Sequence, residues 1–265
     1  MAHILVTGGA GGLGREVVKR LRQTSHTVRV MSRANAPTDL EPHIEWAQAD
    51  VESGSGLTEA VEGIDIIINA MSLPARPQQV DVEGTQRLLK VAQHAGVKHV
   101  LHVSIVGIDR IPTPYYQAKV AAEQVVAESG VPYSIWRATQ FHSLLDNFLE
   151  PLRTSDSAPV FSRPPEAKYQ LLDTGEAAEA LLSHIDSPPA GRLPDVGGPQ
   201  VLTLDTIAHM WLEAQGINRQ IKYLPEEPII SEGFRQGYNT IPTNPYGKIT
   251  WADYLKQRYG HPVSG

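Results

Sequence analysis

The chain of 265 residues contains no cysteine. Disulfide bonds, thiolate catalysis and zinc–thiolate sites are therefore excluded. No apolar run approaches the length that a membrane span needs. A strand is expected to begin by residue 3, which leaves no room for a signal peptide ahead of it. We therefore expect a soluble, cytoplasmic protein without a membrane partner.

Positive charge is also scarce, with 23 Lys and Arg against 29 Asp and Glu and a formal net charge of −6. No basic patch stands out, which argues against electrostatic binding of nucleic acid. The 10 histidines are scattered. His99 and His102 stand three apart in an expected strand and so face opposite sides of it. We therefore predict neither a nucleic-acid partner nor a metal site.

What the chain does have is a glycine-rich turn between an expected strand, 3–6, and a helix expected from Arg15. In such a turn the first glycine allows a tight bend, the second a close approach to a pyrophosphate, and the third close packing of helix on strand. The free N–H groups at the helix start then face the anion. This context favours a dinucleotide site over a glycine turn without a ligand. The expected cofactor contacts in the turn are Thr7, Gly8, Gly11, Gly12, Leu13 and Gly14.

Strands and helices alternate regularly through the first half of the chain. Branched and apolar runs predict strands at 27–33, 44–47, 64–70, 97–103 and 133–137. Helices are expected at 54–62, 78–94 and 114–128. This rhythm predicts an α/β fold, a doubly wound and mostly parallel sheet of the dinucleotide-binding Rossmann type.

The rhythm breaks after about residue 138, where prolines punctuate short segments. Helices are expected at 173–184, 204–215 and 250–259, and one strand at 192–202. We therefore predict a dinucleotide-binding core over 1–138 and a smaller C-terminal substrate-side lobe over 139–265, partly interleaved with the core.

Residues after the last core strand are expected to line a substrate pocket, because pockets open at the carboxyl ends of parallel strands. These residues are Gln140, Phe141 and His142. We expect His142 to be a polar lining residue rather than a catalytic base. Four apolar residues nearby form either a wall of the pocket or the core face of a helix, and the sequence does not distinguish these alternatives. They are Phe141, Leu144, Leu145 and Phe148.

The end of the second strand bears on the choice of dinucleotide. NAD-binding versions carry a carboxylate there for the ribose 2′-hydroxyl. This chain has Ser32 and Arg33 instead, and its nearest carboxylate is Asp39, beyond a proline-containing loop. Arg33 can offer two hydrogen bonds to a 2′-phosphate and Ser32 one more, although an ordinary solvated arginine is the alternative. We therefore predict NADP(H) in preference to NAD(H). Further expected contacts are Asp50 and Val51 beside the adenine, and Asn69, Ala70 and Met71 in the cofactor crevice.

A serine, a tyrosine and a lysine form the candidate catalytic set. Ser104 ends the fifth core strand, and Tyr115 and Lys119 lie four apart on one face of the next helix, which Pro114 should begin. A phenol has a pKa of about 10, which a nearby lysine and an oxidised nicotinamide lower. We expect Ser104 to hydrogen-bond the substrate oxygen, Tyr115 to transfer a proton to it, and Lys119 also to hold the nicotinamide ribose. Tyr116 is a rival for the role, about 100° away around the helix.

These residues resemble the atypical, NmrA-like branch of the short-chain dehydrogenase/reductase superfamily. The resemblance rests on Thr7-Gly8-x-x-Gly11-x-x-Gly14, on Ser104 and on Tyr115-x-x-x-Lys119, and it covers essentially the whole chain. It implies a nicotinamide cofactor and, in the NADPH-dependent members, reduction of quinones, carbonyls or double bonds. Other members are nucleotide-binding regulators that lack the tyrosine and lysine. The chain departs from the larger classical branch at Asn69-Ala70-Met71, where Asn-Ala-Gly is usual, and in a slightly short spacing from Ser104 to Tyr115.

Two functions of different classes follow as hypotheses. The first is an NADPH-dependent oxidoreductase that transfers hydride to a small carbonyl, quinone or conjugated substrate. The second is a non-catalytic NAD(P)-binding sensor or regulator, which would have no need for Tyr115 and Lys119. Sugar-nucleotide epimerase or dehydratase chemistry is a weaker third, because the C-terminal lobe is short and no diphosphate clamp is visible. The expected partner is a small-molecule substrate, and the sequence leaves monomer and homodimer open.

Overall fold

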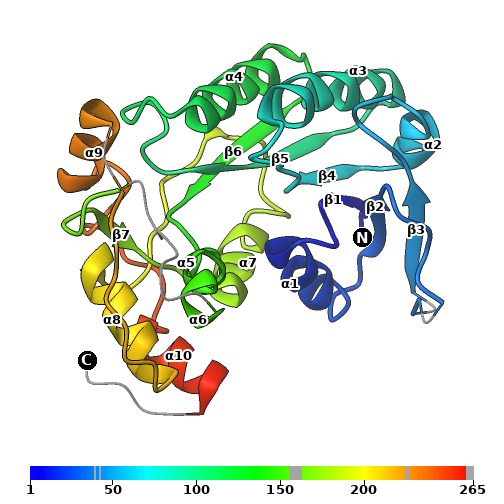
Figure 1. Ribbon diagram of the computed structural model, residues 1–265. Coiled ribbons are helices and arrows are strands. Elements are labelled where there is room, and N and C mark those ends of the chain that lie inside the picture. The colour runs from blue at the N-terminus through cyan, green and yellow to red at the C-terminus, as the bar shows by residue number, and fades with distance from the viewer. Residues whose placement is uncertain (39, 42, 155–162, 225–226, 261–265) are drawn as a thin grey trace. The chain divides into compact units, whose positions relative to one another are not determined.

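The computed structural model describes residues 1–38, 40–41, 43–154, 163–224 and 227–260 (Figure 1). Asp39, the carboxylate nearest to the second strand, lies outside these residues. The chain divides into two compact units, each made of three segments. The first unit comprises Met1–Ser104, Pro114–Arg137 and Ala178–Pro194, and the second Ile105–Thr113, Ala138–Ala177 and Asp195–Gly265.

The first unit is built on a seven-stranded sheet. Its strands are β1 (His3–Thr7), β2 (Thr27–Ser32), β3 (Ile44–Gln48), β4 (Ile66–Asn69), β5 (His99–Ile105), β6 (Tyr133–Ala138) and β8 (Gly191–Arg192). Their order in the sheet is β3-β2-β1-β4-β5-β6-β8, and Figure 1 labels these strands apart from β8. The chain runs outward from β1 to β3, returns to β4 and continues to the other edge in parallel pairs. This is the doubly wound parallel order that the sequence predicts.

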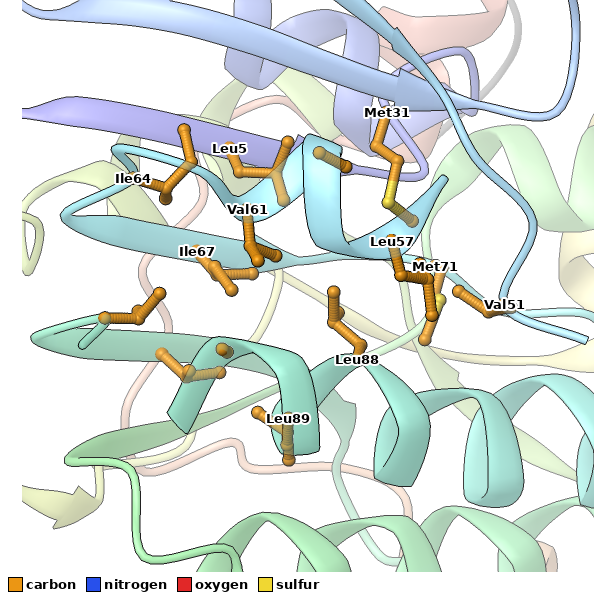
Figure 2. Packing of buried hydrophobic residues seen from close by; sticks show 14 of the residues in the cluster. Leu5, Met31, Val51, Leu57, Val61, Ile64, Ile67, Met71, Leu88 and Leu89 are labelled. Carbon is orange, nitrogen blue, oxygen red and sulfur yellow. The ribbon is translucent and has the colours of Figure 1, made fainter. Parts of the chain in front are cut away.

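Helices cover both faces of this sheet. They are α1 (Gly12–Leu21), α2 (Leu57–Val61), α3 (Thr85–Ala95), α4 (Pro114–Glu128), the π-helix η1 (Gln78–Gly84) and the second half of α7 (Thr174–Leu182). α3 and α4 lie on one face and α1 on the other (Figure 1). On the face of α3, the strand residues Leu5 and Ile67 share one buried apolar cluster with Leu88 and Leu89 (Figure 2). Burial of this apolar stripe holds the helix on the sheet.

The register of the sheet aligns three polar side chains at the carboxyl ends of neighbouring strands. Thr7 of β1 pairs with Asn69 of β4, and Asn69 pairs with His102 of β5. The three residues are almost completely buried, at 0%, 0% and 1% exposure. Because residues in register point to the same face, these polar groups can satisfy one another inside an apolar sheet.

The helix predicted at 78–94 forms as two consecutive parts. Residues Gln78–Gly84 make the π-helix η1, and α3 follows directly from Thr85. Gly84 at the junction packs closely, because a Cβ there would stand 2.8 Å from Cγ2 of Val51. π-turns are rare and occur mostly at functional sites. This one carries a buried carboxylate, Asp81.

The second unit contains an antiparallel pair of strands, β7 (Lys168–Gln170) and β9 (Val201–Thr203), and several short helices. The helices are α5 (His142–Leu149), α6 (Pro151–Thr154), α8 (Leu204–Ala214), α9 (Pro228–Arg235) and α10 (Trp251–Tyr259). The Asp146 carboxylate of α5 accepts hydrogen bonds from Trp211 Nε1 of α8 at 2.7 Å and from Tyr254 OH of α10 at 3.0 Å. This buried carboxylate therefore ties the three helices together.

The prediction of one strand at 192–202 is wrong. The segment contributes to two strands in different sheets, β8 beside β6 and β9 beside β7. Pro194 and Pro199 lie between them, and each lacks the N–H that a continuous ladder of hydrogen bonds needs. The helix predicted at 250–259 is confirmed as α10, whose start is capped by Thr250 and Asp253.

Candidate functional site

The glycine turn between β1 and α1 leaves its backbone open to a ligand. Gly8 has a left-handed φ of 67°, and a Cβ there would stand 2.7 Å from the Ala70 carbonyl oxygen. Gly14 packs so closely that a Cβ on it would overlap the Gly8 carbonyl. No side chain of the described residues caps α1 after Gly11, so the first N–H groups of the helix are free for an anion. These features fit the pyrophosphate of a dinucleotide.

A cleft of about 250 Å³ opens beside this turn, at the carboxyl ends of β1, β2, β3 and β4. Most of the residues predicted to contact a cofactor line it: Gly8, Gly11, Ser32, Arg33, Asp50, Val51, Ala70 and Met71. Of the remaining predicted residues of the turn, Thr7 ends β1, and Gly12, Leu13 and Gly14 form the start of α1. The parallel sheet thus gathers residues from four strand ends at one site, as its topology requires.

Two arginines meet one carboxylate at the edge of this cleft. Arg33 Nη1 lies 3.4 Å from Glu52 Oε2, and Arg76 Nη1 lies 2.8 Å from Glu52 Oε1. The arginine side chains are 60% and 51% exposed, whereas Glu52 is 19% exposed. Both cations can therefore be reached by an anion that competes with Glu52. Ser32, the other residue predicted here, accepts a hydrogen bond from the Ala34 N–H.

Asp50, predicted to lie beside the adenine, holds the loop that follows β3. Its Oδ1 accepts the Glu52 N–H and its Oδ2 the Ser53 hydroxyl, each at 3.0 Å. Burial raises the pKa of Asp50, but these hydrogen bonds outweigh it and leave the pKa below its ordinary value. The cleft wall therefore carries an ionised carboxylate at neutral pH.

Thr7 and Asn69, also predicted to contact the cofactor, do not line the cleft but are buried at the ends of β1 and β4. The Thr7 hydroxyl donates to Asn69 Oδ1 at 2.8 Å, and Asn69 Nδ2 contacts His102 Nδ1 at 3.1 Å. Because the amide nitrogen donates, Nδ1 accepts and the proton of the neutral ring is on Nε2. Burial lowers the pKa of His102 well below its ordinary value, and the charge of Lys119 lowers it further. Among the described residues His102 Nε2 has no hydrogen-bond partner.

Tyr115 and Lys119 lie on α4, which begins and ends where the sequence predicts. The Tyr115 hydroxyl lies 2.7 Å from Ser72 Oγ, and Ser72 lines the cleft. Lys119 Nζ donates to the Val103 carbonyl at 3.0 Å and lies 3.5 Å from Asp81 Oδ1. The side chains of this ion pair are 3% and 0% exposed. The phenol therefore meets a serine at the cleft, and the lysine meets a buried carboxylate.

Burial and the charge of Asp81 dominate the electrostatic setting of the Tyr115 phenol. Burial raises the pKa of Tyr115, the hydrogen bond with Ser72 opposes that change, and the charge of Asp81 raises the pKa again. Burial lowers the pKa of Lys119, and Asp81 opposes this. Lys119 is not among the groups that shift the pKa of Tyr115 here, so the expected lowering by the lysine and an oxidised nicotinamide stays a prediction. Tyr115 keeps its proton at neutral pH.

Ser104, near the end of β5, is 2% exposed, and its Oγ has no hydrogen-bond partner among the described residues. Leaving a buried hydroxyl unpaired costs roughly 1–3 kcal/mol, so a ligand atom that pairs with it is favoured. Tyr116 is 7% exposed, and its ring centroid lies 6.0 Å from that of Tyr115. Since the Tyr115 hydroxyl is the one that reaches Ser72 at the cleft, Tyr115 is the better candidate to face a nicotinamide.

Gln140, Phe141 and His142 belong to the second unit, before and at the start of α5. Gln140 Oε1 accepts a hydrogen bond from Asn239 Nδ2 at 3.2 Å. Gln140 and His142 are buried, whereas Phe141 is partly exposed. The apolar residues that follow divide by helical spacing into a buried pair, Leu145 and Leu149, and an exposed pair, Leu144 and Phe148. α5 therefore has an apolar core face and an apolar outer face.

His142 packs within an aromatic cluster of the second unit. Its ring centroid lies 5.7 Å from that of Trp251 and 5.1 Å from that of Tyr254. Burial lowers the pKa of His142 to about 4, against the charges of Asp173 and Asp253, which raise it. The ring is therefore neutral at pH 7, and neither ring nitrogen has a hydrogen-bond partner among the described residues.

Sequence reasoning missed four polar residues at the site, Glu52, Ser72, Arg76 and Asp81. Asp81 had a detectable signal, because it lies in step with the buried positions Thr85 and Leu88 of the helical pattern. A carboxylate on the buried face of an amphipathic helix needs a buried partner. The other three residues follow β3 and β4 in loops, where no periodicity constrains side-chain direction.

The part of the chain that the structure describes offers no group of three or more His, Cys, Asp or Glu side chains that could hold a metal ion. His99 Nε2 contacts Ser134 Oγ at 2.9 Å while His102 Nδ1 contacts Asn69, so the two rings serve different neighbours. None of the described helices has the length and apolar character needed to cross a membrane.

Residues 8–147 match a family described as NAD(P)H-binding. The chain belongs to this NAD(P)H-binding family. The matched segment is more than half of the chain and contains the glycine turn, the cleft residues, Tyr115 and Lys119. The open N–H groups and the crowded glycines of the turn accord with such a cofactor on independent, geometric grounds.

Curated relatives of the chain include a dehydrogenase and a reductase. A 3 beta-hydroxysteroid dehydrogenase/Delta 5-->4-isomerase of Mycobacterium tuberculosis (strain CDC 1551 / Oshkosh) is 28% identical over 193 residues, covering 57% of this chain and 52% of that protein. The chain thus spans about half the length of this relative. A (4-alkanoyl-5-oxo-2,5-dihydrofuran-3-yl)methyl phosphate reductase of Streptomyces griseus subsp. griseus is 26% identical over 203 residues, covering 76% of this chain and 69% of that protein.

A solved structure supports the fold. A short-chain dehydrogenase/reductase superfamily protein from Agrobacterium tumefaciens, with bound NAD, aligns with a TM-score of 0.69 and 20% identity. The alignment covers 97% of this chain and 96% of that one. At this identity the likeness shows the fold alone.

Proposed function

We propose that the protein is an NADPH-dependent oxidoreductase that exchanges a hydride with a small carbonyl, quinone or conjugated substrate. The observation that carries this proposal is the Tyr115 hydroxyl, which meets Ser72 at the cleft beside the glycine turn. A protonated phenol held there can act as a general acid toward a substrate oxygen. The dehydrogenase and the reductase among the relatives support the same class of chemistry.

Each part of the candidate site would have a distinct task. A nicotinamide dinucleotide supplies the hydride when it is bound. The N–H groups at the start of α1 would hold its pyrophosphate. Tyr115 would give its proton to the substrate oxygen, and the unpartnered hydroxyl of Ser104 would hydrogen-bond the same oxygen. Lys119, bonded to the Val103 carbonyl, would keep α4 in place beside β5.

Replacing the tyrosine tests the proposal. With NADPH and a panel of quinones, aldehydes, ketones and enones, we expect the parent protein to consume NADPH with at least one compound. Tyr115→Phe should lower kcat on that compound by roughly 100-fold or more, because general acid catalysis contributes about 10²–10⁴ in rate. Tyr116→Phe on the same helix is the matched control and should keep most of the activity.

Two results would count against this function. Equal rates for Tyr115→Phe and the parent would remove the acid role from Tyr115. A parent that binds oxidised and reduced cofactor with similar affinity and reduces nothing would instead favour the sensor that has no catalytic activity.

We infer NADP(H) rather than NAD(H) from the arginines at the cleft edge. Arg33 and Arg76 converge on Glu52 with exposed guanidinium groups. A 2′-phosphate would offer both of them a more highly charged partner than one carboxylate does. NmrA-like membership, which the motifs suggest, fits the same preference.

Calorimetric titration with NADPH and NADH tests the preference. We expect tighter binding of NADPH by the parent, and a loss of about tenfold in NADPH affinity for Arg33→Ala and for Arg76→Ala, because each removes a charge-assisted bond. Glu52→Gln should tighten NADPH binding, since it removes the competing anion. Arg22→Ala is the matched control, because Arg22 pairs with Glu41 away from the cleft. Tighter binding of NADH by the parent would overturn the assignment.

A further inference from the structure

Asp81 is a buried carboxylate whose hydrogen-bond partners lead to the cleft. It lies in the π-helix η1 and is 1% exposed. Its Oδ1 accepts the Ser72 hydroxyl at 2.7 Å, and its Oδ2 accepts the Leu73 N–H at 3.1 Å. Lys119 Nζ stands 3.5 Å from Oδ1. These partners hold the carboxylate in one orientation inside the protein.

The hydrogen bonds between the cleft and Asp81 run in one direction. Ser72 has a single hydroxyl proton, which it donates to the Asp81 carboxylate. Its oxygen can then only accept, so the Tyr115 hydroxyl, 2.7 Å away, donates to it. The three side chains therefore form an ordered chain that begins at the cleft and ends on a buried carboxylate.

Lys119 on α4 is the charged group beside Asp81 in the described residues, and the same lysine acts on His102 of β5. Burial lowers the pKa of Lys119, while the carboxylates of Asp81 and Glu123 raise it. His102 on β5 is neutral, because burial lowers its pKa well below the ordinary value. Burial raises the pKa of Tyr115, and the charge of Asp81 raises it further. Removing the Asp81 charge would remove its contribution to the raised pKa of Tyr115 and so favour the ionised phenol.

We propose that Asp81 is a positioning residue that acts on Tyr115 through Ser72 and forms the buried end of a proton relay. This inference rests on the proposed oxidoreductase function. A bound nicotinamide dinucleotide would take the hydride of an alcohol that is oxidised, and the hydroxyl proton of the alcohol would go to the Tyr115 oxygen. The Tyr115 proton passes to Ser72 and the Ser72 proton to Asp81, which becomes a neutral carboxylic acid. Reduction reverses every transfer and starts from the neutral carboxylic acid of Asp81, so each O–H bond that breaks is matched by one that forms.

The π-helix accounts for the position of Asp81. η1 packs against α4, the helix that carries Tyr115 and Lys119. Val80 packs into the apolar cluster of the first unit, while the next residue, Asp81, turns toward Lys119. The wider turn of a π-helix allows one residue to pack in the apolar core while the next contacts a polar site. Such turns occur mostly at functional sites.

Ionisation of Tyr115 tests the relay without any substrate. The full chain would be labelled with carbon-13 at tyrosine Cζ, and Tyr115→Phe would identify the Tyr115 signal. In Asp81→Asn we expect Tyr115 to ionise about one to three pH units lower than in the parent, because the amide keeps an acceptor but removes the negative charge. Asp65→Asn removes a carboxylate elsewhere in the same unit and should leave the signal unchanged. A Tyr115 signal that titrates alike in Asp81→Asn and the parent would overturn the proposal.

Turnover tests the serine link. Ser72→Ala breaks the chain between Tyr115 and Asp81 but leaves the ion pair of Asp81 with Lys119 intact. With NADPH and menadione as the probe, we expect Ser72→Ala to lower kcat by roughly tenfold to a hundredfold with little change in either KM, because only proton transfer is impaired. Ser72→Thr keeps the hydroxyl and should restore most of the rate.

The outcomes separate the relay from the proposed function. If Tyr115→Phe is slow while Ser72→Ala and Asp81→Asn match the parent, the relay is wrong and the proposed function stands. If Tyr115→Phe matches the parent, the proposed function is wrong and the relay has no reaction to serve. If the parent does not reduce menadione, the tyrosine titration alone decides whether Asp81 controls Tyr115.

Discussion

His102 lies in the first unit and His142 in the second, and burial lowers the pKa of both rings. An amide, Asn69, fixes the tautomer of His102, whereas His142 lies among the rings of Trp251 and Tyr254. In both places a protonated ring would lose its hydration without gaining a full set of hydrogen bonds. Both histidines therefore act as neutral groups at physiological pH.

Protonation of His142 should destabilise the fold. The pKa of His142 is about 4 in the folded protein, against an ordinary value of 6.5. As the pH falls through 6.5, the unfolded chain takes up a proton that the folded chain does not, so stability decreases until the folded ring is also protonated at about pH 4. The gap between the two pKa values corresponds to roughly 3 kcal/mol.

Urea unfolding at about pH 7 and about pH 4 measures this effect. We expect the parent to lose roughly 3 kcal/mol more than His142→Phe between these conditions, because phenylalanine keeps the ring packing without the proton. His94→Phe replaces an exposed histidine and should lose as much as the parent. Equal losses in the parent and His142→Phe would show that His142 titrates as an ordinary histidine.

At the scale of elements, the first sheet could be predicted because its signals are local. The helix expected at 114–128 forms at Pro114–Glu128, and the strand expected at 97–103 forms at His99–Ile105. Strands buried on both faces appear in the sequence as apolar runs, and the helices between them as amphipathic stretches. Neither signal requires knowledge of distant contacts.

The second unit was harder to predict because its elements depend on partners far away in the chain. β7 and β9 have three residues each and exist by pairing with one another. α9 was not predicted, because its stretch is rich in prolines that suggest a loop. Pro228 instead takes the first helical position, where a missing N–H costs nothing.

The residues of the candidate site also divide into those that local spacing predicts and those that only distant packing brings together. One helical turn places Tyr115 and Lys119 on a common face, and this spacing is visible in the sequence. Ser72 and Asp81 precede them in a loop and in η1, and only the packing of η1 on α4 brings them to the phenol and the lysine. The local spacing could therefore indicate Tyr115 as the proton donor, but not Asp81 as the carboxylate at the other end of its hydrogen-bond chain.

The β1–α1 turn predicts a difference between two glycine substitutions. Gly8 and Gly63 have similar left-handed φ values, 67° and 70°, so alanine suffers similar backbone strain at each. A Cβ at position 8 would meet the Ala70 carbonyl oxygen at 2.7 Å, whereas at position 63 no described atom lies within 4 Å. We expect Gly63→Ala to cost about 1 kcal/mol and Gly8→Ala roughly 2–3 kcal/mol.

Urea unfolding and NADPH calorimetry together check this pair. Gly8→Ala should also weaken NADPH binding, because the turn would shift at the helix start, whereas Gly63→Ala should keep the parent affinity. Equal destabilisation and equal affinity for the two variants would mean that the close approach of Gly8 to β4 has no energetic importance.

At the scale of the whole chain, the two units are interleaved in sequence. The first unit takes Ala178–Pro194 from beyond residue 138, and this segment supplies β8 at the edge of the sheet. A truncated chain that ended at 138 would therefore lack one strand of the sheet. The division into a dinucleotide core and a substrate lobe at that residue stays a proposal.

The position of β8 has a consequence for synthesis on the ribosome. β1 to β6 emerge in order and can pair as they appear, but the partner of Ser134 and Ile135 arrives only with Gly191 and Arg192. Until then β6 is an open edge, with backbone N–H and C=O groups that any extended segment can join. A nascent chain that pauses in this interval is the form most exposed to aggregation, and pairing of Gly191 and Arg192 with β6 ends that exposure.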